Sequence, residues 1–111
     1  MQTNFSSSYS VLMSIYKKEN PAFLIQALDS MLNQTVSPAE IVMVKDGPLT
    51  HELEDVLQDY DFLHPGLFNF VSYEKNHGLG YALRQGILAC SNEIVAPVSY
   101  THLRAHETEL H

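Results

Sequence analysis

Short apolar runs alternate along the chain with longer segments in which apolar residues recur every three or four positions. Four such runs, at 9–16, 41–44, 68–73 and 93–96, stop at polar residues or turns. Runs of this length predict β-strands, and the spacing between them predicts amphipathic helices. The third run alternates apolar with polar residues, which favours an edge strand. The order βαβαβαβ therefore predicts an α/β fold with a parallel sheet and right-handed crossovers.

Capping residues and prolines mark where these helices begin and end. Asn20 precedes Pro21, so an N-cap residue is followed by proline at the first helical position, and Pro38 stops this helix. Thr50 can cap the second helix, and we expect the third over 80–90. The residues expected to face the sheet are Leu24, Ala27, Leu28, Met31 and Leu32 in the first helix, Leu53, Val56, Leu57 and Tyr60 in the second, and Ala82, Leu83, Gly86, Ile87 and Cys90 in the third.

Polar side chains follow the first two apolar runs. Ser14, Tyr16 and Glu19 lie at the end of the first run, and Lys45 and Asp46 directly follow the second. In open parallel sheets, ligands bind in the crevice beyond the carboxyl ends of the strands. We therefore expect these five residues to contribute to one ligand site.

Composition restricts the classes of partner. The chain has 111 residues, of which 45% are hydrophobic, and this suits one globular domain. Its formal net charge of -7 and pI of about 5.1 provide no broad basic surface, so we do not expect it to bind nucleic acid. The single cysteine, Cys90, is expected to be a buried structural thiol. No apolar run approaches the roughly 20 residues that span a bilayer, so we expect a cytoplasmic protein.

Residues 76–80, with the sequence NHGLG, form a glycine-containing loop before the third helix. The glycines permit a close approach of the backbone, and we expect N–H groups here, including that of Gly78, to be free to meet a pyrophosphate. Arg84 could reach a phosphate as well, with an exposed helical arginine as the alternative. The spacing of the glycines departs from a dinucleotide fingerprint.

Three motifs, in this order and at strand ends, resemble those of family 2 glycosyltransferases, including bacterial members that build cell-surface polysaccharides. They are VLMSIYKKE at 11–19, IVMVKDGPL at 41–49, and NHGLGYALRQG at 76–86. The third is similar to the family pattern Asn-x-Gly-x-x-x-Ala-x-Asn-x-Gly. The resemblance covers nearly all of the chain before Pro97. It implies the N-terminal, nucleotide-binding part of a GT-A domain, built on a Rossmann-like parallel sheet.

This resemblance implies roles for the residues at the strand ends. Tyr16 would pack near the base of the nucleotide, with Ser14 by the base or ribose and Glu19 at the same strand end. Asp46 would accept a hydrogen bond from the base, for instance from N3–H of uracil, because a carboxylate suits a donor edge. The alternatives are a packing aromatic for Tyr16 and a turn-stabilising residue for Asp46. Lys45 stands where the family often has an acid.

The resemblance also shows what is missing. Members of the family place an Asp-x-Asp motif after the fourth strand, where it holds Mn²⁺ or Mg²⁺ against the diphosphate. This chain has no aspartate after Asp61, so we expect no metal site and no catalytic residue in it. From Pro97 the sequence resembles a translated sequencing adapter. We therefore divide the chain into a disordered start (1–8), the nucleotide-sugar-binding half of a GT-A domain (9–96) and a non-native or disordered tail (97–111).

The function that follows is transfer of a sugar from a nucleotide diphosphate donor, a UDP-sugar, to a saccharide or lipid-linked acceptor. This chain is expected to be an inactive part of such an enzyme, and the inner face of the membrane is an option for the full protein. Two alternatives stay open. One is a small doubly wound regulatory module similar to a receiver domain. The other is a nucleotidyltransferase, which would need a glycine-rich loop directly after the first strand, and the residues at 15–18, IYKK, supply none.

Overall fold

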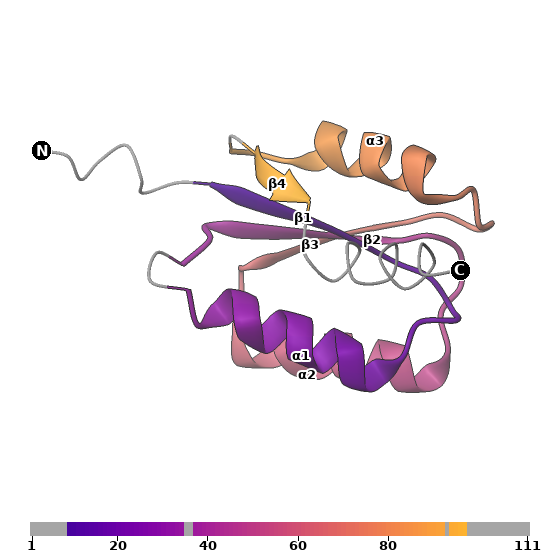
Figure 1. Ribbon diagram of the computed structural model, residues 1–111, viewed down its shortest axis with the longest axis horizontal. Helices are drawn as coiled ribbons and strands as arrows, with labels where there is room; N and C mark the ends of the chain where they lie inside the picture. Colours follow the sequence, from indigo (N-terminus) through magenta and orange to yellow (C-terminus); the bar gives the residue numbers. More distant parts are fainter. Residues whose placement is uncertain (1–8, 35–36, 93, 98–111) are drawn as a thin grey trace, which may run out of the picture.

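The computed structural model describes residues 9–34, 37–92 and 94–97, and it confirms the predicted α/β order (Figure 1). Each element lies close to its predicted position. The fourth strand ends at Pro97 and not before it, whereas 1–8 and 98–111, predicted to be disordered or non-native, lie outside the described residues. The elements are β1 (Ser10–Ile15), α1 (Pro21–Leu32), β2 (Glu40–Lys45), α2 (His51–Leu63), β3 (Phe68–Ser72), α3 (Leu79–Ala89) and β4 (Ile94–Pro97).

The four strands form one parallel sheet in the order β3-β2-β1-β4. β1 and β2 lie in the centre, paired from Ser10 opposite Glu40 to Ile15 opposite Lys45. β3 lies at an edge, as its alternating pattern predicts. Because all the strands run the same way, their carboxyl ends, and the loops that follow them, meet at one end of the sheet.

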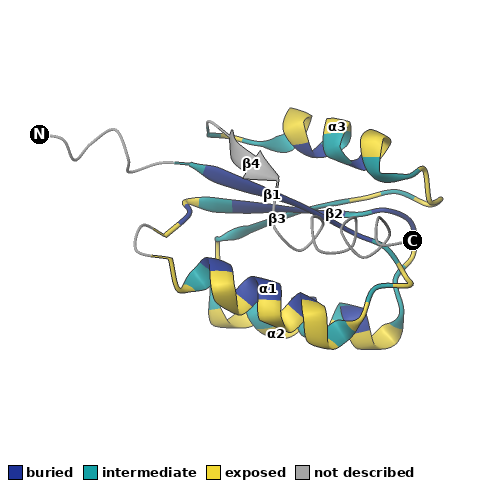
Figure 2. Ribbon diagram, viewed as in Figure 1, coloured by how far each residue is buried: buried dark blue, intermediate teal, exposed yellow. Residues whose placement is uncertain are grey.

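Helices cover both faces of the sheet, so the central strands are buried on both sides (Figures 1 and 2). α1 and α2 pack on one face, against Met13 and Ile15 of β1, whereas α3 packs on the other face, against Leu12. This alternation is the period-two pattern of a strand. It accounts for the continuously apolar sequence of the two central strands, since each face needs its own apolar residues.

Local signals set the starts of α1 and α2 as predicted. The Asn20 side chain accepts a hydrogen bond from the N–H of Ala22 (2.8 Å), and Thr50 Oγ1 accepts one from Leu53 N–H (3.2 Å). α3 has no cap from its own N-cap residue, Gly78. Among the described residues, no helix is long and apolar enough to cross a membrane.

α3 lies close to the sheet because Gly86 faces it. A Cβ at this position would collide with Leu12 Cδ1 and would lie 3.0 Å from Val44 Cγ2. Gly86 and Ala82 are the buried residues of the helix. Small side chains on this side of α3 therefore bring its backbone close to β1 and β2.

A carboxylate fixes the far end of α3 to the sheet, at the amino ends of the strands. Glu40, the first residue of β2, accepts hydrogen bonds from Ser10 Oγ (2.6 Å) and Asn69 Nδ2 (3.0 Å). It also accepts them from the N–H (2.8 Å) and Oγ (3.3 Å) of Ser91, just beyond α3. The Glu40 side chain thus joins three strands to the loop that follows α3.

Candidate nucleotide-binding site

A pocket of about 230 Å³ opens at the carboxyl ends of β1 and β2. It brings together Tyr16, Asp46 and Gly78, three of the six residues that the sequence indicated for nucleotide binding. Asn76 and Leu79 complete its lining. The pocket therefore lies at the sheet end that was predicted from the polar residues after the first two strands.

Asp46 is the central residue of the pocket. It directly follows β2, is only 4% exposed, and points toward the loop before α3. Its carboxylate accepts hydrogen bonds from the N–H groups of His77 (2.8 Å) and Gly78 (3.0 Å). The Asn76 side chain donates to the Asp46 carbonyl oxygen (3.3 Å). Asp46 thus fixes the loop immediately before α3 from a distant strand.

Gly47 permits this close approach. Its φ of +89° lies in the left-handed region that favours glycine, and a Cβ here would lie 2.8 Å from the Asn76 nitrogen. Any other residue would push the 76–78 loop away from Asp46. The Asp-Gly pair therefore provides both the carboxylate and the room for the loop that binds it.

This arrangement corrects one expectation about the glycine loop. We predicted that the N–H of Gly78 would be free to meet a pyrophosphate. In the structure the N–H groups of Gly78 and His77 both donate to the Asp46 carboxylate. An anion does sit at the start of α3, as the helix dipole favours, but that anion is the protein's own side chain.

Three rings pack together beside the pocket. Tyr73 makes edge contacts with His77 and Tyr81, at ring-centre distances of 5.3 and 5.1 Å, and His77 lies 4.2 Å from Tyr81. The Tyr73 hydroxyl oxygen is buried without a hydrogen-bond partner among the described residues. Burial, followed by the nearby Asp46 carboxylate, raises the pKa of this phenol above its usual range. The phenol therefore stays protonated, as a potential donor beside Asp46. Tyr73 was not predicted as a site residue. The one signal for it in the sequence is its position directly after the third strand.

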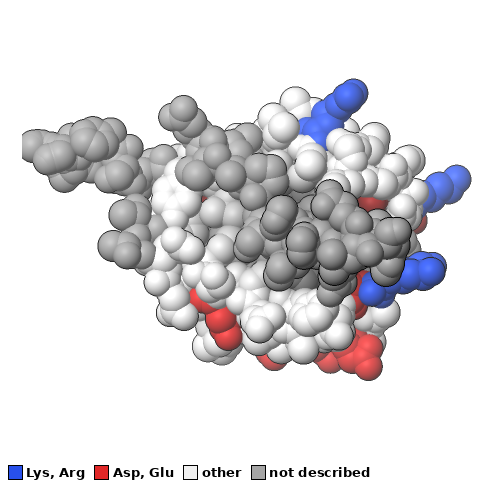
Figure 3. All heavy atoms as spheres, in the orientation of Figure 1, with Lys and Arg blue, Asp and Glu red and all other residues white. Residues whose placement is uncertain are grey.

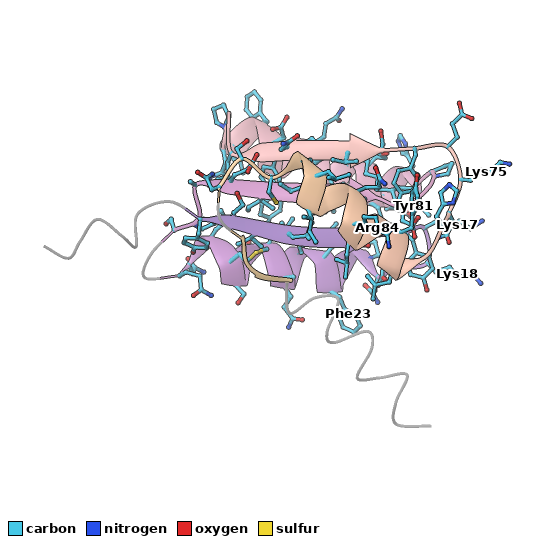
Figure 4. The ribbon with its side chains drawn as sticks, turned by 90° about the horizontal axis from the view of Figure 1, so that it is seen from above. Lys17, Lys18, Phe23, Lys75, Tyr81 and Arg84 are labelled. Carbon is cyan, nitrogen blue, oxygen red and sulfur yellow. The ribbon has the colours of Figure 1, made fainter. Side chains whose placement is uncertain are left out.

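The other predicted residues lie around the pocket without lining it. Ser14 is buried in β1 and, two residues after Leu12, belongs to the α3 side of the sheet. Glu19 is half-buried, and its N–H donates to the Tyr16 carbonyl oxygen (3.1 Å) in the turn after β1. Arg84 is exposed on α3 (Figure 4). The structure thus places them near the site, and their roles remain predictions.

Lys45 points away from the pocket. Its ammonium lies 2.9 Å from Glu54 Oε1 and 4.8 Å from the centre of the Phe70 ring, on the α2 side of the sheet. Neighbouring residues of a strand alternate between faces, which explains why the side chains of Lys45 and Asp46 point to opposite faces of the sheet. The sequence reading grouped Lys45 with the ligand site, and this placement is wrong.

The described residues do not fit a divalent metal ion. Asp46 is the one carboxylate among the residues that line the pocket. Nowhere in the described part of the chain do three or more His, Cys, Asp or Glu side chains gather in a way that could hold a metal.

Comparisons with known proteins identify the family and the fold of the chain. The model of the family described as "Glycosyl transferase family 2" matches residues 10–98. The chain is 41% identical over 88 residues to the UDP-Gal:alpha-D-GlcNAc-diphosphoundecaprenol beta-1,3-galactosyltransferase of Escherichia coli, covering 78% of this chain and 31% of that protein. It is 43% identical over 88 residues to the amylovoran biosynthesis glycosyltransferase AmsE of Erwinia amylovora, covering 79% and 32%.

A solved structure shares the fold. The mannosyltransferase PcManGT of Pyrobaculum calidifontis, determined in complex with GDP-Man and Mn²⁺, superposes with a TM-score of 0.64 at 18% identity, covering 77% of this chain and 24% of that chain. This likeness confirms the predicted GT-A architecture. The chain spans about a third of the length of the curated relatives that it matches.

Proposed function

The chain belongs to glycosyl transferase family 2, and from this membership we propose that it binds the nucleotide of a sugar donor. The full protein would transfer the sugar from a nucleotide diphosphate, a UDP-sugar, to a saccharide or lipid-linked acceptor. Two relatives support this assignment, because their names describe a galactosyl transfer to a diphosphoundecaprenol-linked sugar and the biosynthesis of amylovoran. We assign the full protein to cell-surface polysaccharide biosynthesis, at the inner face of the membrane.

The observation that carries the proposal is the unfilled acceptor capacity of Asp46. A carboxylate offers about four acceptor positions, and the loop before α3 occupies two of them. The remaining positions adjoin the pocket that Asp46 lines together with Tyr16. A planar base with an N–H edge fits this pair, because the edge can donate to the carboxylate while the ring packs against the tyrosine. Uracil, with its N3–H, has this chemistry.

The other predicted residues have supporting roles in this proposal. Ser14 and Glu19 lie at the end of β1, on the side of the base and ribose. Arg84, exposed on α3, would neutralise a phosphate. Gly78 contributes by bringing the loop backbone close to Asp46, and its N–H is left out of phosphate binding. With neither a catalytic base nor a metal site assigned to the described residues, we propose that the chain by itself binds nucleotide without turnover, and that the full-length enzyme uses Mn²⁺ or Mg²⁺.

A titration with two nucleosides tests the base assignment. We expect uridine to bind more tightly than 3-methyluridine, which lacks the N3–H donor, in calorimetry or by chemical-shift perturbation. A hydrogen bond to a charged group contributes about 1.5–3 kcal/mol, which corresponds to roughly 10- to 150-fold in affinity. Asp46→Asn should remove this preference, because one of its two polar atoms is a donor. Equal affinity of the wild-type protein for the two nucleosides would rule out the assignment of Asp46 to N3–H.

The structure does not favour a receiver-like module. Such a domain gathers several acidic side chains and a lysine around one pocket. Here Asp46 is the one carboxylate lining the pocket, and Lys45 is paired with Glu54 on the other face of the sheet. Binding of a phosphate mimic such as beryllium fluoride, without binding of uridine, would restore this alternative.

A further inference from the structure

The two helical layers of the molecule differ sharply in charge. α1 and α2 together carry six acidic residues and neither lysine nor arginine. By contrast, residues 75–92, which include all of α3, hold Lys75 and Arg84 without any acidic residue. Figure 3 shows this asymmetry on one face of the molecule, where acidic side chains lie toward α1 and α2 and basic ones toward α3 and the adjoining end. In a chain of net charge -7, this segregation gives the domain a basic side and an acidic side.

The basic side also exposes apolar surface. Tyr81, Ile87 and Leu88 of α3 are 40%, 52% and 75% exposed, although Ala82 and Gly86 of the same helix are buried. Arg84 lies between them in the sequence and is exposed as well. The prediction that Ile87 faces the sheet is therefore wrong, and α3 has apolar residues on its outward side in addition to the small residues that face the sheet. A helix surface that exposes apolar side chains is more favourably covered by a partner than a purely polar surface is.

Further cations flank this helix. In the view onto α3, Lys17, Lys18 and Lys75 project at the same end of the molecule as Tyr81 and Arg84 (Figure 4). None of these cations belongs to the residues that line the pocket, and all are exposed. They are therefore available to a partner outside the pocket.

We propose that the α3 face, defined as Lys75, Tyr81, Arg84, Ile87 and Leu88, docks on the surface of an anionic phospholipid bilayer. Basic side chains attract anionic headgroups, and apolar and aromatic side chains between them insert at the boundary of the acyl chains. The acidic α1 and α2 layer is repelled by the same surface, so the charge asymmetry orients the domain. Glu19 and Glu74 in the neighbouring loops reduce the local positive charge, so insertion of Ile87 and Leu88 must contribute part of the affinity.

The proposal gives a physical cause for the proposed membrane location, and Arg84 is the one residue that it shares with the proposed donor site. It is tested with the 111-residue chain by vesicle co-sedimentation. One set of vesicles contains equal parts of phosphatidylglycerol and phosphatidylcholine, and the other contains phosphatidylcholine alone. We expect binding to the anionic vesicles, weakening as salt is added because salt screens exposed charges. Uridine binding, measured separately, reports on the pocket.

Three variants separate the contributions. Lys75→Gln with Arg84→Gln should weaken vesicle binding by about five-fold for each charge removed. Leu88→Gln should weaken it by about ten-fold, because insertion of one leucine side chain is lost. As a matched control, Gln26→Glu with Gln58→Glu makes the same change in net charge on exposed positions of α1 and α2, and should leave binding unchanged.

Other results would overturn the proposal. Equal binding to the two kinds of vesicle, or an equal loss of binding in the control variant, would exclude specific docking by the α3 face. A monomer that binds neither kind of vesicle would exclude the bilayer as the partner. A concentration-dependent dimer that Leu88→Gln makes monomeric, without vesicle binding, would assign the α3 face to contact with a second copy of the chain.

Discussion

An acidic residue at each end of β2 accepts hydrogen bonds from a loop next to α3, but the two carboxylates differ in how many hydrogen bonds they accept. Glu40 stands at the start of β2 and Asp46 directly after its end, and each carboxylate accepts hydrogen bonds from the loop at one end of α3. The two acids therefore hold α3 across the sheet, one at each end. They differ in how completely their acceptor positions are used.

Glu40 accepts four hydrogen bonds, which fill the capacity of a carboxylate. Asp46 accepts two from the loop before α3 and faces a pocket. An acid whose acceptor positions are all hydrogen-bonded stabilises a fold, whereas one with acceptor positions left over can bind a ligand. The comparison indicates that the amino end of the sheet is built for stability and the carboxyl end for binding.

The largest expected effect comes from removing each carboxylate in turn. We expect Glu40→Ala to lower the free energy of unfolding by about 2–3 kcal/mol, because the fully buried Ser10 loses its acceptor together with Asn69 and Ser91. Asp46→Ala should cost only about 1 kcal/mol, because water can reach the freed N–H groups of the 76–78 loop.

Urea denaturation followed by circular dichroism measures both values, with the exposed Glu74→Ala as the control. If Asp46→Ala is as destabilising as Glu40→Ala, the two ends do not differ in the way proposed.

The second prediction separates stability from binding. Glu40→Gln keeps the shape of the side chain but replaces one acceptor oxygen with a donor, so we expect a loss of about 1 kcal/mol. Its affinity for uridine should equal that of the wild type, since Glu40 lies at the opposite end of the sheet. Asp46→Asn should show the reverse, with a smaller change in stability and a clear loss of uridine affinity. Loss of uridine binding in folded Glu40→Gln would mean that the two ends are coupled through α3.

The sequence predicted what short-range patterns encode. The strands, the helices and the caps at Asn20 and Thr50 follow from neighbouring residues, and the structure confirms them. Asp46 could be indicated as well, because a polar residue after a buried strand lies at the end of the sheet where ligands bind. These inferences needed no knowledge of which distant residues meet.

The sequence could not predict the partners of the two acids. Gly78 lies 32 residues from Asp46, and Ser91 lies 51 residues from Glu40. No local pattern pairs residues at such separations, which explains why the N–H of Gly78 was wrongly expected to be free. That the side chains of Lys45 and Asp46 lie on opposite faces of the sheet can be inferred from the two-residue period of a strand, but only when the last residue of β2 is known.

A third and smaller effect compares two hydroxyls, one beside each acid. Ser10 Oγ donates to Glu40 and accepts from the N–H of Asn92, so Ser10→Ala should cost about 1 kcal/mol. The Tyr73 hydroxyl is buried close to the Asp46 carboxylate, which raises the pKa of the phenol, but the two groups do not meet the geometry of a hydrogen bond. Tyr73→Phe keeps the ring contacts and should be neutral or slightly stabilising in thermal denaturation, because an unsatisfied buried group is removed. A loss of stability in Tyr73→Phe equal to that in Ser10→Ala would show that the carboxyl end is as fully bonded as the amino end.

The smallest expected effect is the pH dependence that Glu40 contributes. Burial works in the opposite direction, but hydrogen bonds from Ser10, Ser91 and Asn69 outweigh it and lower the pKa of Glu40 below its ordinary value of 4.5. A carboxyl group whose pKa is lower in the folded state adds stability above its unfolded pKa, and this stability is lost as the pH falls through the folded value. The wild type should therefore lose stability below about pH 4.5 more steeply than Glu40→Gln, in which position 40 does not titrate.

Melting temperatures measured from neutral pH down to pH 3 provide the comparison, with Glu74→Gln as the exposed control. Parallel curves for the wild type and Glu40→Gln would mean that the four hydrogen bonds hold Glu40 no more firmly when it is charged than when it is neutral, and the contrast with Asp46 would then rest on geometry alone.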